Sequence, residues 1–105
     1  MNKVEDVLRQ SKRCIRFEDG KDATVTYKIV RNRVNIGENL AVETYGMALY
    51  QVENNDNGEK ICISKEIRDI TISEKKITKL WENMVGGQVT VATFGEIVED
   101  FIESI

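Results

Sequence analysis

Residues 12–30, KRCIRFEDGKDATVTYKIV, decide the fold of the first half of the chain. Their apolar side chains recur with a period of two on both sides of one dipeptide: Ile15, Phe17, Ala23, Val25, Tyr27 and Ile29. This period is typical of half-buried β-strands. The dipeptide between them is Asp19-Gly20, which tolerates the positive φ angles of a tight hairpin turn. The stretch therefore predicts an antiparallel hairpin.

The pattern continues toward the C-terminus. A second turn is expected around Asn35 to Asn39, followed by the β-branched and aromatic run LAVETYGMALYQV over residues 40–52. Asn57-Gly58 is a further hairpin turn, and it returns the chain into a strand. Four antiparallel strands in a meander are the economical interpretation. Gly46, inside the third strand, indicates a bulge, a bend or a close approach by another segment.

The hydrophobic period changes after residue 72. In residues 73–87, SEKKITKLWENMVGG, one helical face is lined by Ile77, Leu80, Trp81, Met84 and Val85. Ser73 is the expected N-cap, and Gly86-Gly87 is expected to end the helix. We therefore expect the first helix to begin after Ser73.

A second helix is predicted after the extended residues 88–91, QVTV. Thr93 and Glu96 have the spacing of a capping box. The expected buried stripe of this helix consists of Ile97, Val98, Phe101, Ile102 and Ile105. Strands followed by helices predict an α+β fold, in which two C-terminal amphipathic helices pack on one face of a four-stranded antiparallel meander.

The chain has 105 residues, of which 41% are apolar and 31% charged, as in an ordinary folded domain. We expect one domain over residues 1–105. Within it, residues 1–10 form a short N-terminal segment, residues 12–67 the strand-rich part and residues 73–105 the helical part. No linker separates these parts.

Two residue types are missing, and their absence limits the chemistry. Without histidine there is no Ser-His-Asp or Cys-His nucleophilic site and no HExxH zinc site. There is no proline, and no phosphate-binding or dinucleotide-binding glycine motif occurs. Cys14 and Cys62 lack CxxC spacing and are expected to be free thiols. We expect no enzyme activity, no cofactor and no metal.

The location expected for this chain is the cytoplasm. Its N-terminal residues, MNKVEDVLRQ, lack the apolar core of a secretory signal. The longest strongly apolar run is far shorter than the ~18 to 20 residues that span a bilayer. We therefore expect no membrane partner.

Several stretches together resemble one known group of proteins. They are residues 70–75 (ITISEK), the helix through Trp81, Val89-Thr90, Phe94 and residues 97–102 (IVEDFI), with Tyr45-Gly46-Met47 and Asn57-Gly58 upstream. They are similar to a domain-of-unknown-function family of small proteins from Gram-positive, spore-forming anaerobes, from about Val25 onward. This resemblance implies no known activity.

The chain departs from that family's pattern at two positions. The family has proline after Val-Thr and histidine two residues later, where this chain has Val91 and Thr93. If the histidine is catalytic in relatives, this chain cannot share the chemistry. A capping role for position 93 is the simpler account.

Charge is distributed unevenly along the chain. Residues 1–33 carry a formal +4 and residues 34–105 a formal −7. Lys28, Arg31 and Arg33 crowd the second strand, while Glu99, Asp100 and Glu103 lie at the C-terminal end of the last helix, where the dipole disfavours negative charge. The seven candidates for partner binding are Lys28, Arg31, Arg33, Trp81, Glu99, Asp100 and Glu103. Trp81 is expected mainly in the core, and at a helix edge it could anchor a partner.

Three explanations of the acidic helix end are open. Fraying is tolerated, the basic strands of the same molecule lie nearby, or a second molecule supplies the cations. The hypothesis we favour is a small cytosolic protein that recognises another protein through its acidic helix or basic strand edge. Its partner is an unknown protein or a second copy in which opposite charges meet.

The alternative is a nucleic-acid accessory protein that binds through Lys28, Arg31 and Arg33. The acidic overall charge and the scarcity of exposed aromatic residues disfavour nucleic acid. An enzyme that uses carboxylates alone is the least favoured hypothesis.

Overall fold

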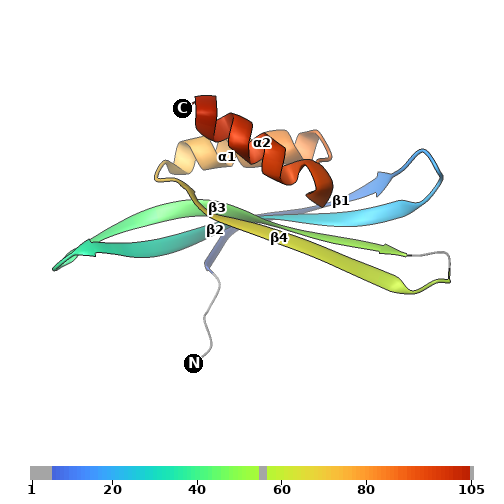
Figure 1. The fold of residues 1–105 in the computed structure, drawn as a ribbon, viewed down its shortest axis with the longest axis horizontal. Helices are drawn as coiled ribbons and strands as arrows, with labels where there is room; N and C mark the ends of the chain where they lie inside the picture. The colour runs from blue at the N-terminus through green and yellow to red at the C-terminus, as the bar shows by residue number, and fades with distance from the viewer. Residues whose placement is uncertain (1–5, 55–56, 105) are drawn as a thin grey trace.

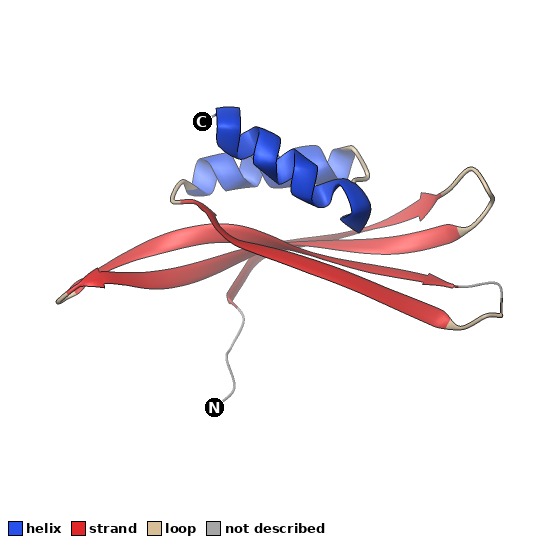
Figure 2. Ribbon diagram, viewed as in Figure 1, coloured by secondary structure: helices blue, strands red, loops and turns tan. Residues whose placement is uncertain are grey.

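A long antiparallel sheet carries two helices on one of its faces (Figures 1 and 2). The computed structural model describes residues 6–54 and 57–104. Within these residues the elements are β1 (Asp6–Arg16), β2 (Asp22–Gly37), β3 (Leu40–Asn54), β4 (Lys60–Thr71), α1 (Glu74–Gly86) and α2 (Val91–Ser104). Each strand pairs with its chain neighbours, in the order β1-β2-β3-β4. The expected α+β meander with two C-terminal helices is confirmed.

The two faces of the sheet differ because alternate side chains point in opposite directions. We call the face toward the helices the helix face. The core on that face joins Val25, Tyr27, Ile29, Met47 and Leu49 of the sheet to Ile77, Leu80 and Met84 of α1 and to Phe94 and Val98 of α2. We call the other face the open face, since both helices lie on the opposite side of the sheet (Figure 2). Thr26, Lys28 and Tyr50 belong to the open face.

Two of the predicted hairpins form, but only the glycine of each turn dipeptide has a positive φ, 85° at Gly20 and 81° at Gly58. The first of these turns is a loop over residues 17–21, longer than the tight turn expected. The turn between β2 and β3 is tighter than expected. It consists of Glu38 and Asn39, and Asn39 adopts a φ of 60°. Asparagine tolerates this left-handed conformation better than most residues, which allows both strands to run almost to the tip.

The strand-rich part extends beyond residues 12–67 at both ends. β1 begins at Asp6, inside the expected N-terminal segment, and its pairing with β2 shifts between Val7 and Arg9. Leu8, in this bulge, packs against the core. The expected N-terminal segment over residues 1–10 therefore belongs to a strand from residue 6 on, and residues 1–5 lie outside the described residues. At the other end, β4 continues to Thr71.

A bulge in β4 packs directly on Gly46. Tyr45 pairs with Thr71 and Met47 with Ile67, so β4 holds two more residues than β3 between these pairs. A Cβ at Gly46 would lie 2.3 Å from the carbonyl oxygen of Ile67. Of the three expectations for Gly46, the structure shows two: a bulge in the pairing at this position and close approach by the backbone of β4.

Asp69 holds the shape of this bulge. Its φ of 55° is left-handed, and its carboxylate accepts hydrogen bonds from the Thr44 hydroxyl and the Asn32 amide. Aspartate enters this conformation more readily than most residues. The side chain of Asp69 therefore links the bulge by hydrogen bonds to both β2 and β3.

α1 begins as predicted, with the Ser73 Oγ accepting from the Lys76 N–H at 3.2 Å. It ends at Gly86, but the glycines do not supply the left-handed residue of the cap. Gly87 has a φ of −84°, and the left-handed residue is Gln88, at 52°. The Val89 N–H donates to the Met84 carbonyl at 3.1 Å, which completes a Schellman motif around Gln88.

α2 begins earlier than predicted. The N–H groups of Thr93 and Phe94 both donate to the Thr90 carbonyl, so the helix is already formed at Val91. The prediction of an extended Val91 and of a capping box at Thr93 and Glu96 is therefore wrong. The Val91 N–H instead donates to Oε1 of Gln51 in β3, at 3.1 Å. Gln51, a residue of the sheet, therefore caps the start of α2.

The buried stripe of α2 also differs from the prediction. Phe94 and Val98 are its buried residues, and Ile97 and Phe101 are half-buried. Ile102 is 47% exposed. Ile105 lies outside the described residues. The helix begins at Val91, three residues before the start that the capping box implied, so Phe94 lies within its first turn and is one of its buried residues.

Candidate interaction surfaces

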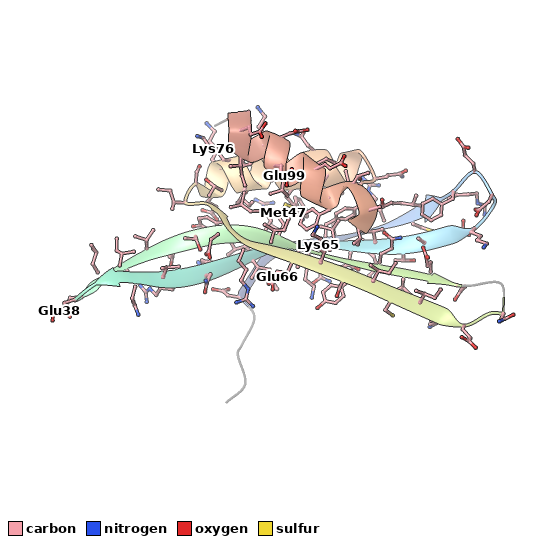
Figure 3. The ribbon with its side chains drawn as sticks, in the orientation of Figure 1. Glu38, Met47, Lys65, Glu66, Lys76 and Glu99 are labelled. Carbon is pink, nitrogen blue, oxygen red and sulfur yellow. The ribbon has the colours of Figure 1, made fainter. Side chains whose placement is uncertain are left out.

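The charged residues on the exposed side of α2 are all acidic. Glu99, Asp100 and Glu103 are all exposed, and the last turn contains no basic residue. Figure 3 labels Glu99 on α2. Within residues 6–54 and 57–104, no cation lies within ion-pair distance of these three carboxylates. α2 contacts β4 and β3, whereas the basic strand β1 forms the opposite edge of the sheet. The explanation that the molecule's own basic strands lie beside this helix end is therefore not supported.

The three cations of β2 do not form one surface. Lys28 lies on the open face, where its ammonium is 4.9 Å from the centroid of the Tyr50 ring. Arg31 and Arg33 belong to the other face, by strand alternation from Ile29. Lys28 is thus separated by the sheet from the two arginines.

Carboxylates accompany both arginines. Arg31 Nη2 lies 2.6 Å from Asp6 Oδ2, and this hydrogen bond raises the pKa of Arg31. Arg33 pairs across the strands with Glu43. Together with Asn32 these residues line an open depression of about 340 Å³. Its two cations are matched by two carboxylates, so it lacks the positive potential that a nucleic-acid backbone requires.

Trp81 connects α1 to the sheet. Its indole N–H donates to the Tyr27 carbonyl at 3.2 Å, and the Arg9 guanidinium lies 6.0 Å from its ring centroid. The half-buried ring packs against the core. The expectation that Trp81 is mainly a core residue agrees with this position, and its half-buried side chain remains partly exposed.

The two edges of the sheet are surfaces that the sequence did not single out. No described strand pairs with the outer side of β1 or of β4. Ile61 and Ile63, near the start of β4, are 38% and 40% exposed although both belong to the helix face. α2 starts over Gln51, which pairs with Ile63, and so leaves both side chains uncovered. The apolar alternation predicted a strand but could not show what would cover it.

The two cysteines are free and exposed, as expected. They lie in one row across the open face, because Cys14 pairs with Thr24, Thr24 with Val52 and Val52 with Cys62. Three inter-strand spacings separate them, about 14 Å. This separation excludes a disulfide between them in this fold.

Burial raises the pKa of Tyr27, whose hydroxyl donates to the Val89 carbonyl at 2.6 Å. Burial also raises the pKa of Tyr45, with smaller contributions from Glu74 and Glu43. Both tyrosines are therefore held neutral, as packing residues with a polar end. They offer no base to a neighbouring nucleophile.

The described part of the chain shows no cluster of three Cys, Asp or Glu side chains placed to hold a metal ion. None of its helices has the length and apolar character to cross a membrane. Besides the depression at Arg31, two further open hollows measure about 230 and 180 Å³, one beside Phe17 and one beside Tyr50. The surface features that remain are charge, free strand edges and exposed isoleucines.

Comparisons with known proteins place the chain in a family. No curated protein sequence and no solved structure matches it. A match does extend over residues 6–104, nearly the whole chain, and it agrees with the resemblance to a domain of unknown function. The chain belongs to the family of unknown function DUF6514.

Proposed function

We propose that this chain is a small non-catalytic recognition domain that binds another protein through the acidic face of α2. The observation that carries this proposal is the set of Glu99, Asp100 and Glu103, exposed at the negative end of a helix and without an ion-pair partner in the described residues. Glu103 lies in the last turn, where a carboxylate costs about 0.3–1 kcal/mol of helix stability, and Glu99 and Asp100 lie in the turn before it. A basic partner surface would offset this cost.

The proposed setting is the cytoplasm, and the family resemblance implies that the cell is a Gram-positive, spore-forming bacterium. The partner would present lysines and arginines, and complementary charge would speed its encounter with α2 and set its specificity. Binding should then weaken as the salt concentration rises. The division of Lys28 from Arg31 and Arg33 by the sheet makes nucleic acid the weaker proposal.

Affinity co-purification from native cytosol tests this proposal. The tagged wild-type chain should retain a specific protein at low salt and lose it at high salt. The variant E99K/D100K/E103K should lose the same protein. A matched control, E18K/E38K/E82K, makes the same change in net charge at exposed positions away from α2 and should retain it.

Thermal unfolding of each variant provides the control for folding. Cations at the C-terminal end of a helix are favourable, so E99K/D100K/E103K should unfold at the wild-type temperature or slightly above it. Retention of the same partner by this folded variant would refute the proposal.

A further inference from the structure

The two free edges of the sheet differ in how they resist pairing with another chain. β1 carries the cations Arg9, Lys12, Arg13 and Arg16 and a bulge at Leu8. Charges and bulges on an edge strand are the usual devices against edge-to-edge association. A second copy of β1 would bring like charges together. This edge is protected.

The first part of β4 is less protected, because it has no bulge and its three charged residues include both signs. From Lys60 to Ile67 it pairs with β3 without interruption, and its bulge comes only after Ile67. These eight residues, KICISKEI, contain two lysines and one glutamate. Their exposed apolar residues Ile61 and Ile63 lie on one face. A regular, nearly neutral and apolar edge favours the addition of another strand.

We propose that the occupant of this edge is β4 of a second copy of the chain, paired antiparallel about a two-fold axis at Ile63. The two sheets then join into one sheet of eight strands. The proposal goes beyond the recognition function, because it uses the edge of β4 and leaves the acidic face of α2 exposed on both copies.

Charge complementarity selects this register. With Ile63 on the axis, Lys60 lies opposite Glu66 of the second copy, and symmetry repeats the pair. Ile61 lies opposite Lys65, and Cys62 lies opposite Ser64. Opposite charges across an antiparallel pair contribute about 0.2–1 kcal/mol each, and like charges in the same place are unfavourable.

Neighbouring registers lack this match. Moving the axis to Ser64 places Lys60 opposite Arg68, which is a like-charge pair. Moving it to Cys62 places Lys60 opposite Ser64 and brings the two Cys62 side chains together. These differences allow the register to be tested by cross-linking.

The helices leave room for the second copy. α2 begins at the level of Ile63, since its first N–H is held by Gln51. Gly95 lies above Lys65, whose Nζ is 2.9 Å from the position of a Cβ at Gly95. α2 therefore runs along β4 away from the proposed axis, and a two-fold axis directs the second α2 the opposite way. The two helices occupy different halves of the joined edge.

Site-directed cross-linking tests the geometry. In a C14S/C62S background, I63C places two cysteines directly opposite each other, with Cβ atoms about 4.5–5.5 Å apart. Mild oxidation should give a covalent dimer, which SDS gel electrophoresis without reductant detects. The matched control K65C in the same background faces Ile61 and should stay monomeric.

Charge exchange tests the affinity. Sedimentation velocity over a range of concentrations should show that the wild-type chain self-associates. K60E alone or E66K alone should weaken the dimer about tenfold, because each change affects both symmetric pairs. The double variant K60E/E66K restores opposite charges and should return the dimer to within about threefold of wild type.

Three results would overturn the proposal. The first is a wild-type chain that stays monomeric at all concentrations with no cross-link in I63C. The second is a dimer whose affinity is unchanged by K60E and that is dissociated by E99K/D100K/E103K, which would place self-association on α2. The third concerns the register. Efficient oxidation of the native Cys62 pair, with none in I63C, would refute the register centred on Ile63.

Discussion

Replacing Gly46 by alanine should destabilise the fold by about 3 kcal/mol, at the upper end of the cost of overpacking a core. The added Cβ would lie 2.3 Å from the Ile67 carbonyl oxygen and 2.8 Å from the Arg68 Cα. Both atoms belong to the backbone of the β4 bulge, so no side-chain rotation can relieve the contact. The bulge would have to retreat by about 1 Å, which disturbs its hydrogen bonds at Asp69.

Thermal unfolding followed by circular dichroism measures the effect of G46A. A loss of about 3 kcal/mol corresponds to a fall in Tm of roughly 10–20 °C for a domain of this size. The matched control is G37A, since a Cβ at Gly37 has nothing within 4 Å and the residue has no positive φ. This control should stay within about 0.5 kcal/mol of wild type. A G46A variant as stable as G37A would refute the reasoning about close backbone approach.

Two further predictions concern Gln88, in the C-terminal cap of α1, and Tyr27, which binds the segment between the two helices. Q88G should raise the free energy of unfolding by about 0.5–1 kcal/mol, because Gln88 has a φ of 52° and glycine adopts this conformation without strain; a urea midpoint no higher than that of Q88A would contradict it. Y27F should cost about 1–2 kcal/mol at neutral pH, because the Val89 carbonyl loses its donor. Burial raises the pKa of Tyr27 in the folded protein. The contribution of this tyrosine to the free energy of unfolding is therefore present below its pKa in the unfolded chain, about 10, and is lost as the pH rises through its raised pKa in the folded protein. Urea unfolding at pH 8 to 11 should show that the free energy of unfolding falls less with rising pH in Y27F than in the wild type. An equal fall in both proteins would contradict this.

The local patterns of the sequence predicted most of the fold. Asp19-Gly20 and Asn57-Gly58 determine two hairpins by their own conformational preferences, and Ser73 caps α1 through a contact three residues away. Each of these features depends on residues close together in the chain. A single sequence is enough to find them.

The features that the sequence did not predict depend on distant contacts. The cap of α2 comes from Gln51, 40 residues earlier, so no local window could place the helix start at Val91. The left-handed Gln88 is held by the Schellman hydrogen bonds and not by its own preference. The bulge at Asp69 requires Gly46 of the neighbouring strand.

The sequence predicted some of the candidate surfaces and missed others, because the missed ones depend on contacts between residues far apart in the chain. Exposure of Glu99, Asp100 and Glu103 followed from helical period alone. Strand alternation alone places Lys28 on the face opposite Arg31 and Arg33, although all three cations belong to one strand. The uncovered Ile61 and Ile63 depend on where α2 begins, which the sequence misplaced.

The meander also bears on how the chain is made. Every strand pairs with the strand synthesised just before or after it, so each pairing closes only a short loop of chain. Short loops cost little entropy and favour fast folding. On the ribosome, β2 meets a finished β1, and β3 meets a finished hairpin, before the helices have emerged. The two helices then arrive last, and until they dock, the apolar helix face of the growing sheet is open to solvent and to chaperones.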